Sequence, residues 1–252
     1  MGGTLQNGMK AALGGTLLVL IVAGVRVGMI YRERNEAAKA PAPTAQREKI
    51  ADDDLVFLKK KRQSSMADAR ELNGSTIWVS AGGQMDYYPA SGKHVNYGKT
   101  AGTLLGAQKL DVKDFTEQVA PKSATHRIPG GDRQVLMLFT LPDSEKPNEL
   151  YGVPVGYHEN GLYTFYLDEI FFYDDPHKLY AHWGPEVWKA VDSHQVILGM
   201  SERETQLALG QVSKSVSKDY GNRLVVYANL GKPIAVTYVN NKATAFRPDQ
   251  GF

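Results

Sequence analysis

The pattern of hydrophobic and polar positions divides the chain into five parts. Residues 11–31 form a nearly unbroken apolar run with one charge, Arg26. Short apolar runs separated by Gly, Pro, Asn and Asp begin near residue 73 and predict strands and turns. We predict an N-terminal tail at 1–10, a transmembrane helix at 11–31, an Ala/Pro spacer and charged helix at 32–72, a β-rich domain at 73–180 and a C-terminal module at 181–252.

The apolar run has the length of a membrane-spanning helix, because 21 residues rise about 32 Å along a helix axis. A cleaved signal peptide is the alternative. The charged residues Arg32-Glu33-Arg34 after the run favour a retained helix. Gly24 and Gly28 form a G-x-x-x-G that allows close helix contact in lipid, and Arg26 could pair with a carboxylate on a neighbouring helix. These three residues are the predicted contact with a membrane partner.

The middle of the chain predicts a mostly antiparallel β domain. Gln134–Leu141 is apolar at nearly every position, which is typical of a strand that is buried on both faces. Asn160-Gly161 predicts a hairpin turn between two further strands. Several short strands at this spacing predict a small barrel or sandwich, with an SH3-like barrel as one form. Arg47–Arg62 is predicted to be helical, with Asp52–Asp54 near its start and Lys59–Arg62 at its end.

The C-terminal module predicts two helices and then a three-stranded antiparallel meander. Pro185–Ser193 is the first helix, with proline at its first position. Ser201 and Glu204 form a capping box that starts the second helix, and Gly210 ends it as a left-handed cap. The three strands are predicted at Arg223–Asn229, Pro233–Val239 and Ala243–Phe246. The predicted fold class is therefore α+β, with a single N-terminal transmembrane helix.

The module contains Gly199-Met200-Ser201-Glu202 leading to Leu209-Gly210, followed by strands with Val225-Val226-Tyr227 and Val236-Thr237-Tyr238. In these residues it resembles the SmpA/OmlA family of small bacterial envelope lipoproteins, which accompany outer-membrane assembly. The chain departs from the family pattern because the lipid-bearing cysteine is missing and a large domain precedes the module. The resemblance implies a non-catalytic protein-interaction module in the bacterial envelope.

Composition narrows the choice of partner and compartment. The net charge of +2 argues against a nucleic-acid partner held by bulk charge. The chain has no cysteine, which excludes disulfides, thiolate metal sites and a lipid-modified cysteine. We predict no cofactor. The charges beside the apolar run place the head in the cytoplasm, whereas the family resemblance places it in the periplasm. We predict an inner-membrane protein with a periplasmic head and keep the cytoplasmic head as the alternative.

Two groups of residues are candidates for a site. The first is an aromatic set suited to a protein interface or to a β core: Tyr87, Tyr88, Phe171, Phe172 and Tyr173. The second is a carboxylate and imidazole cluster with weak metal-ligating character: Asp174, Asp175, His177 and His182. The spacing of the two histidines fits no common zinc motif, and Asp174-Asp175-Pro176 also forms a natural helix entry.

Three functions compete at this point. The prediction is a membrane-anchored, non-catalytic scaffold or accessory subunit whose head binds a protein in a membrane complex. The first alternative is a module that binds cell-wall glycan or lipid through its aromatic residues. The second is a metal-dependent hydrolase built on the Asp174/His177 cluster. No G-x-S-x-G motif occurs, which argues against a serine hydrolase.

Overall fold

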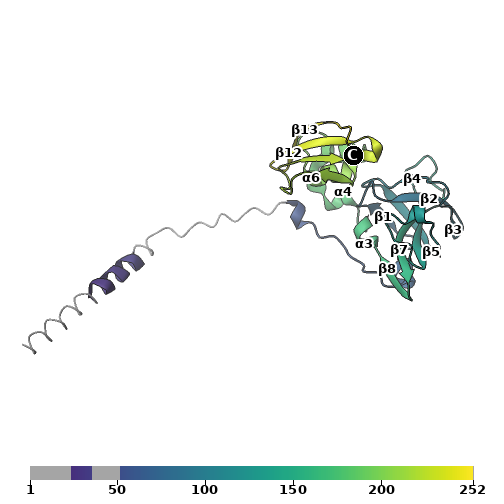
Figure 1. Ribbon diagram of the computed structural model, residues 1–252, viewed down its shortest axis with the longest axis horizontal. Helices are drawn as coiled ribbons and strands as arrows, with labels where there is room; N and C mark the ends of the chain where they lie inside the picture. The colour runs from purple at the N-terminus through teal and green to yellow at the C-terminus, as the bar shows by residue number, and fades with distance from the viewer. Residues whose placement is uncertain (1–23, 36–51, 252) are drawn as a thin grey trace, which may run out of the picture. The chain divides into compact units, whose positions relative to one another are not determined.

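Two antiparallel sheets form the framework of the C-terminal four fifths of the chain (Figure 1). The computed structural model describes residues 24–35 and 52–251. The chain separates into two units, Met1–Ile50 and Ala51–Phe252. The described part of the second unit is α+β, and its sheets are antiparallel in the pairings that the structure gives.

The prediction of a transmembrane helix is wrong for the residues that can be assessed. Within residues 24–35 and 52–251, no helix combines the length and the apolar character needed to cross a bilayer. Residues 24–35 are helical and exposed, and four of them are charged: Arg26, Arg32, Glu33 and Arg34. A span needs about 20 predominantly apolar residues. Gly24 and Gly28 lie on this helix with no other atom near enough to meet an added Cβ. Residues 11–23 of the predicted span lie outside the described residues.

The middle of the chain forms a sheet of nine strands among the described residues, in the order β3-β2-β7-β6-β5-β1-β9, with β4 on β2 and β8 on β7. The strands are β1 (Thr76–Val79), β2 (Asp86–Ser91), β3 (His94–Val95), β4 (Gly102–Thr103), β5 (Lys109–Gln118), β6 (Arg133–Thr140), β7 (Tyr151–Glu159), β8 (Leu162–Phe165) and β9 (Phe171–Phe172). The short helices α2 (Met66–Arg70), η2 (Lys122–Ala124) and α3 (Leu167–Ile170) accompany this sheet.

The nine-stranded sheet curls back on itself instead of dividing into the two sheets of a sandwich. The side chain of Gln118, at the end of β5, accepts from the amide of Val95 at 2.9 Å and donates to its carbonyl at 2.8 Å. These bonds draw the edge strand β3 against β5. The curl encloses a core that includes Phe115, Met137 and Phe139, each fully buried. The apolar run predicted as a buried strand is β6, at the centre of the sheet.

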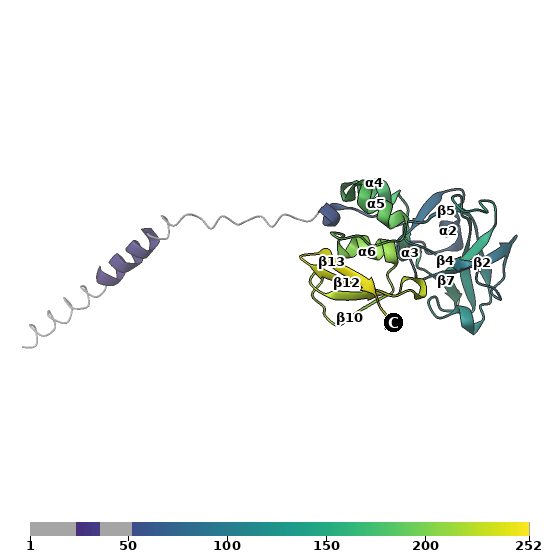
Figure 2. The ribbon, with the colours of Figure 1, turned by 90° about the horizontal axis from the view of Figure 1, so that it is seen from above.

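A helical layer links the two sheets. It comprises α4 (Pro176–Leu179), η3 (Ala181–Trp183), α5 (Gly184–Asp192) and α6 (Glu202–Leu209). The chain then forms a second sheet, in the order β10 (Ser213–Ser215), β11 (Leu224–Tyr227), β12 (Ile234–Val239) and β13 (Lys242–Pro248), with η4 (Asn229–Gly231) between β11 and β12. Figure 2 shows α5 and α6 on one side of this sheet. The predicted meander of three strands is therefore incomplete, because polar Ser213–Ser215 adds a strand that hydrophobic pattern does not indicate.

The start of α6 is formed as predicted. The Ser201 hydroxyl accepts from the Glu204 amide at 3.2 Å, and the Glu204 carboxylate accepts from the Ser201 amide at 2.5 Å. The prediction for the end of α6 is wrong in its geometry. Gly210 has a positive φ of 97°, but its ψ of 162° is extended and does not form a left-handed helical cap.

The loop between β4 and β5 and the helix α6 meet where backbone touches backbone. A Cβ on Gly106 would lie 1.9 Å from the carbonyl oxygen of Leu207 in α6, and one on Gly82 would lie 2.3 Å from the amide of Gly106. The amide of Gln211 donates to the carbonyl of Gly82 at 2.9 Å. Glycine is required at positions 82 and 106, because a side chain there would have to occupy space already taken by main-chain atoms.

A buried ion pair fixes the loop that precedes β11. Glu202 is fully buried in the first turn of α6 and faces the guanidinium of Arg223, whose Nε donates at 3.1 Å. The same carboxylate accepts from the amide of Gly221 at 3.0 Å. The negative charge is thus paired and hydrogen-bonded, as a buried carboxylate requires.

We expect Gly106→Ala to destabilise the protein by about 3 kcal/mol, because the new methyl group forces α6 away from the nine-stranded sheet. Urea unfolding of the purified chain measures this change. Gly130→Ala is the matched control, since its Cβ would meet only the methyl group of Thr125, at 3.2 Å. Equal stability of the two variants would contradict the proposed contact.

We expect Arg223→Ala to cost about 3–5 kcal/mol, because it leaves the Glu202 charge buried without its partner. Breaking the exposed pair of Lys146 and Glu149, which are 3.0 Å apart, should cost less than about 1 kcal/mol. Chemical denaturation of Arg223→Ala and Lys146→Ala gives the comparison. A small effect at Arg223 would show that the pair contributes little to stability.

Candidate functional site

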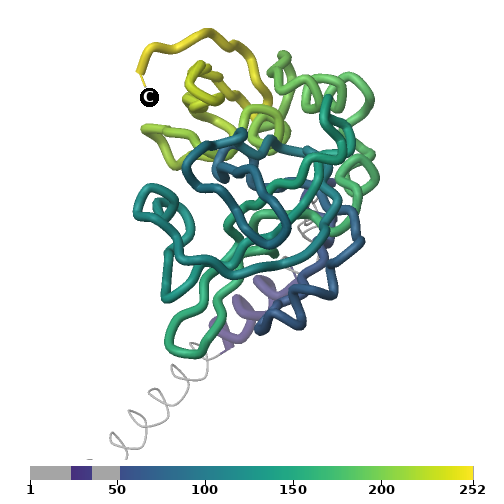
Figure 3. Tube along the Cα trace, turned by 90° about the vertical axis from the view of Figure 1, so that its right-hand side faces the viewer, coloured from purple at the N-terminus to yellow at the C-terminus, as the bar shows by residue number. Residues whose placement is uncertain are grey.

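Residues 52–63 form an extended segment along one side of the second unit, and we call it the strap (Figure 3). Only Asp52–Leu55, at its start, is helical, as the 3-10 helix η1. The predicted charged helix is therefore wrong from residue 56 onward. The physical reason is competition for hydrogen bonds. The amides of Lys61 and Arg62 donate to the Asp168 carboxylate at 2.9 and 3.0 Å instead of to helical carbonyls.

The basic end of the strap is bound to α3 and to the turn after β9, beside the nine-stranded sheet. Lys59 pairs with Asp174 at 2.6 Å, and Lys60 donates to the Asp168 carbonyl. The hydroxyl of Tyr173 also donates to the Asp168 carboxylate, at 2.8 Å. Burial opposes ionisation of Asp168, but the amide, hydroxyl and lysine groups around it outweigh burial and lower its pKa. Residues of the basic run Lys59–Arg62 thus contact carboxylates of the same chain.

The acidic end of the strap is bound to the C-terminal module through Asp53. Its carboxylate accepts from the indole of Trp183 at 2.7 Å and lies 2.6 Å from His182 Nε2. Its backbone carbonyl accepts from Arg203 Nη1 at 2.8 Å, and a second guanidinium nitrogen lies 3.5 Å from Asp54. One short segment therefore contacts both the nine-stranded sheet and the helices of the C-terminal module.

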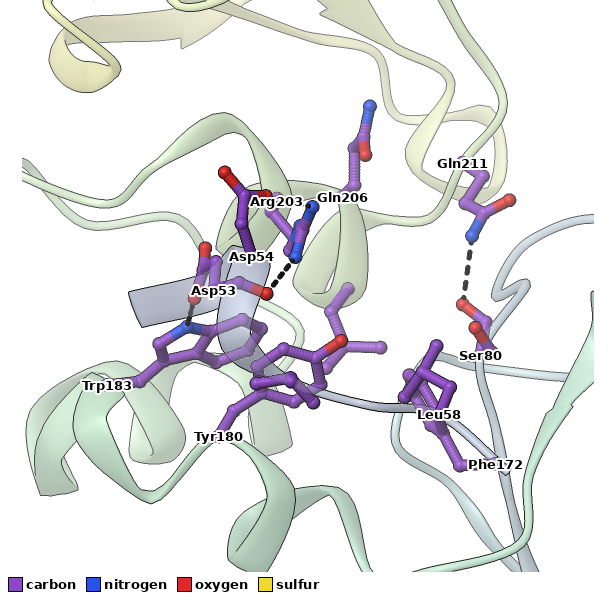
Figure 4. A pocket seen from close by; sticks show the side chains of 12 residues that line it. Asp53, Asp54, Leu58, Ser80, Phe172, Tyr180, Trp183, Arg203, Gln206 and Gln211 are labelled. Atoms are coloured by element: carbon purple, nitrogen blue, oxygen red, sulfur yellow. Dashed lines mark hydrogen bonds and ion pairs between the residues drawn. The ribbon is translucent and has the colours of Figure 1, made fainter. Parts of the chain in front are cut away.

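A cavity of about 400 Å³ lies beneath the strap (Figure 4). Three buried aromatic residues, Phe172, Tyr180 and Trp183, form part of its lining. Its remaining lining residues are Asp53, Asp54, Val56, Leu58, Ser80, Arg203, Gln206, Leu207 and Gln211. The lining residues come from the strap, from the end of β1 and β9, and from η3 and α6. The cavity therefore forms only when the strap, the nine-stranded sheet and the C-terminal module are packed together.

The polar groups that line this cavity are mostly engaged within the chain. Asp53 already accepts several hydrogen bonds, and Gln211 Nε2 donates to the Ser80 carbonyl at 3.1 Å. Burial raises the pKa of Tyr180, so its hydroxyl stays protonated. The cavity offers apolar surface with an amide and a guanidinium at its edge.

The four residues of the predicted metal cluster do not converge on one point: Asp175 and His177 are in contact, whereas Asp174 and His182 pair with other residues. Asp174 pairs with Lys59, and His182 contacts Asp53. Asp175 caps α4 by accepting from the His177 amide at 3.0 Å. Within residues 24–35 and 52–251, no three His, Asp or Glu side chains are grouped so that they could hold a metal ion.

His177 lines a second cavity, of about 550 Å³, but both of its ring nitrogens are engaged. Nδ1 lies 3.1 Å from Asp175 and Nε2 lies 3.1 Å from Asp192. The ring also lies 4.0 Å from that of Trp188. The nearby Ser144 hydroxyl donates to the Leu141 carbonyl at 2.8 Å. His177 therefore links α4 to α5, and neither nitrogen is left for a substrate.

The predicted aromatic interface residues mostly lie inside the fold. Tyr88, Phe171 and Phe172 are buried, and Tyr87 and Tyr173 are half-buried. Tyr87 packs edge-on against Tyr151 with ring centroids 5.1 Å apart. Of the five residues, Phe172 is the one that lines the cavity beneath the strap.

Sequence reasoning missed the residues that define this cavity, Asp53 and Arg203 among them. It also did not predict that three apolar residues of the strap are exposed. We call them the apolar patch: Leu55, Phe57 and Leu58, with 54%, 88% and 41% of their surface exposed. A signal was present. The tetrapeptide Leu55-Val56-Phe57-Leu58 is too apolar for a solvated helix between charged residues.

The chain matches no family model, no curated protein and no solved structure in the comparisons made with it. The function must therefore be argued from the site itself.

The Asp168 carboxylate provides a pH test of the strap. Because its pKa is lowered in the folded protein, its contribution to stability is present above the unfolded value near 3.9 and is lost as the pH falls through the folded value. We expect the amide chemical shifts of Lys61 and Arg62 to titrate with a midpoint below about 3.9. Asp168→Asn should remove this step, whereas Asp174→Asn should leave it. A midpoint at or above the ordinary value contradicts the contact.

Proposed function

We propose that the chain is a non-catalytic accessory subunit whose head binds a protein partner through the strap. The observation that carries this proposal is the exposure of the apolar patch beside the cavity. Phe57 is 88% exposed and lies between two bound positions of the strap, Asp53 and Lys61. A large aromatic side chain that is presented to solvent between two bound positions is typical of a binding anchor.

The cavity extends the surface that a partner would contact. Leu58 belongs to both the apolar patch and the cavity lining. A partner that covers Phe57 would therefore also contact Leu58 at the cavity that Phe172 and Gln206 help to line. Such a combination of an apolar centre and a few polar groups at the edge is typical of protein interfaces.

The alternatives have weaker support. Binding of glycan by aromatic stacking needs exposed ring faces, but Tyr180 and Trp183 are only 5% and 8% exposed. The hydrolase alternative needs a histidine with a free ring nitrogen, but both ring nitrogens of His177 contact carboxylates. The resemblance of the C-terminal module to envelope interaction proteins is consistent with a binding role. The predicted periplasmic location of the head stays a prediction.

Site-specific photo-crosslinking in the native cells tests this function. A photoreactive amino acid at Leu58 should yield one discrete adduct with a partner, which mass spectrometry then identifies. The same group at Glu145, an exposed position after β6, is the control and should not yield that adduct. No adduct at Leu58, together with purification of a lone monomer, would contradict the proposed function.

Phe57→Ala should weaken binding of the identified partner about thirtyfold, because truncation of a central aromatic anchor costs about 2 kcal/mol. Phe246→Ala is the matched control, since Phe246 is also exposed but lies on β13. Binding of both purified variants is measured by titration calorimetry, and circular dichroism checks their folding. Equal binding by the two variants would show that the strap is not the contact.

A further inference from the structure

The centre of the strap has main-chain groups that the rest of the described chain does not bind. The strap is attached on either side of this centre, at Asp53 and at Lys61. Between these positions, the amides and carbonyls of residues 57–60 form no hydrogen bond with other described residues. An extended segment with free N–H and C=O groups is a ready template for pairing with another strand, like the edge of a sheet.

The side chains at this centre alternate between the protein and the solvent. Val56 packs against the core of the C-terminal module, and Leu58 lines the cavity beneath the strap. Phe57 lies between them and is 88% exposed. Successive side chains of an extended segment point in opposite directions. The strap therefore presents a large aromatic side chain together with unpaired main-chain groups.

The charges of the strap have opposite signs on the two sides of Phe57, because the sequence there reads DDD, LVFL, KKKR. The charges nearer the centre are mostly engaged within the chain. The two at the outer ends are available. Asp52 is exposed and forms no hydrogen bond or ion pair with other described residues, and Arg62 uses only its amide, at Asp168. One end thus offers a carboxylate and the other a guanidinium.

Two copies of such a segment are complementary when they run antiparallel. A two-fold axis near Phe57 places the acidic end of each strap beside the basic end of the other, so that Asp52 and Arg62 meet at both ends. The two Phe57 rings meet at the axis, and an aromatic pair stabilises a contact beyond its buried area. A parallel arrangement would instead bring like charges together, which is unfavourable.

We infer that the strap pairs with the strap of a second copy of the chain, antiparallel, to form a two-fold dimer. Main-chain hydrogen bonds between residues 57–60 of the two copies form its centre, and charge pairs close both ends. A strand of another protein could bind the same main-chain groups, but the strap itself already supplies both complementary ends. This inference rests on the proposed function, because it names the partner that the strap binds.

Charge reversals test the pairing on the full chain. Asp52→Arg and Arg62→Asp should each weaken dimerisation at least about tenfold, because each variant brings like charges together at both ends. When the two variants are mixed, they should associate with each other, since every end then joins an acid to a base. Sedimentation with one variant fluorescently labelled measures both effects. Unchanged dimerisation of the single variants, or no association in the mixture, overturns the inference.

The matched control reverses charges outside the strap. Glu145→Arg and Lys122→Asp change exposed residues by the same amounts, and both should dimerise as the wild type does, alone and mixed. Phe57→Ala should weaken the dimer at least about tenfold without any change of charge, with circular dichroism as the check on folding. A dimer that Phe57→Ala leaves intact lies on another surface and overturns the inference.

Hydrogen exchange locates the contact on the main chain. The amides of residues 57–60 should be protected at high protein concentration and should exchange freely at low concentration, because only the dimer supplies acceptors for them. The amides of Lys61 and Arg62 are the internal control, since Asp168 binds them within one chain. Rapid exchange of residues 57–60 in the dimer overturns the pairing.

Photo-crosslinking at Leu58 separates the failure of this inference from the failure of the proposed function. An adduct between two copies of the chain supports both. An adduct with a different protein, together with a monomeric purified chain, overturns the inference and leaves the proposed function in place. A monomer without any adduct overturns both.

Discussion

The close contact between Gly106 and α6 determines how the rest of the head is arranged. Main-chain atoms of the nine-stranded sheet and of the C-terminal module touch there without an intervening side chain. This contact sets the distance between β9 and α6, and therefore the width of the cavity between them. It also sets the separation of Asp53 and Asp168, the two points at which the strap is bound. The strap can bind at both points because the distance between the nine-stranded sheet and the C-terminal module is fixed.

Local patterns were sufficient to predict those elements whose structure depends on neighbouring residues. The apolar run that became β6, the Asn160-Gly161 turn and the Ser201/Glu204 capping box depend on neighbouring residues, and the structure has all three. The limits appear where a partner lies far along the chain. Ser213–Ser215 is polar and becomes a strand only because β11 offers its edge. The three residues have no alternation of apolar and polar side chains that would indicate a strand.

The candidate site depended almost entirely on such distant contacts. Asp53 meets Trp183, which is 130 positions away, and Lys61 meets Asp168, which is 107 positions away. The charge pattern of residues 47–62 suited a helix, but the Asp168 carboxylate of α3 accepts from the amides of Lys61 and Arg62 instead. Conversely, the Asp and His residues that are neighbours in sequence near position 175 do not form one cluster: Asp175 and His177 contact each other, but Asp174 and His182 pair with residues of the strap. Proximity along the chain was misleading in both directions.

The order of contacts along the strap determines the order in which they would break under a pulling force from the N-terminal side. Traction applied to the chain before residue 52 reaches Asp53 first, and it must break the bonds to Trp183 and Arg203 before any strain arrives at Asp168. The contacts therefore break one after another. The contact at Asp168 carries no force until Asp53 has separated from the C-terminal module. Detachment in that sequence would open the cavity from the α6 side while Lys59 and Asp174 are still joined.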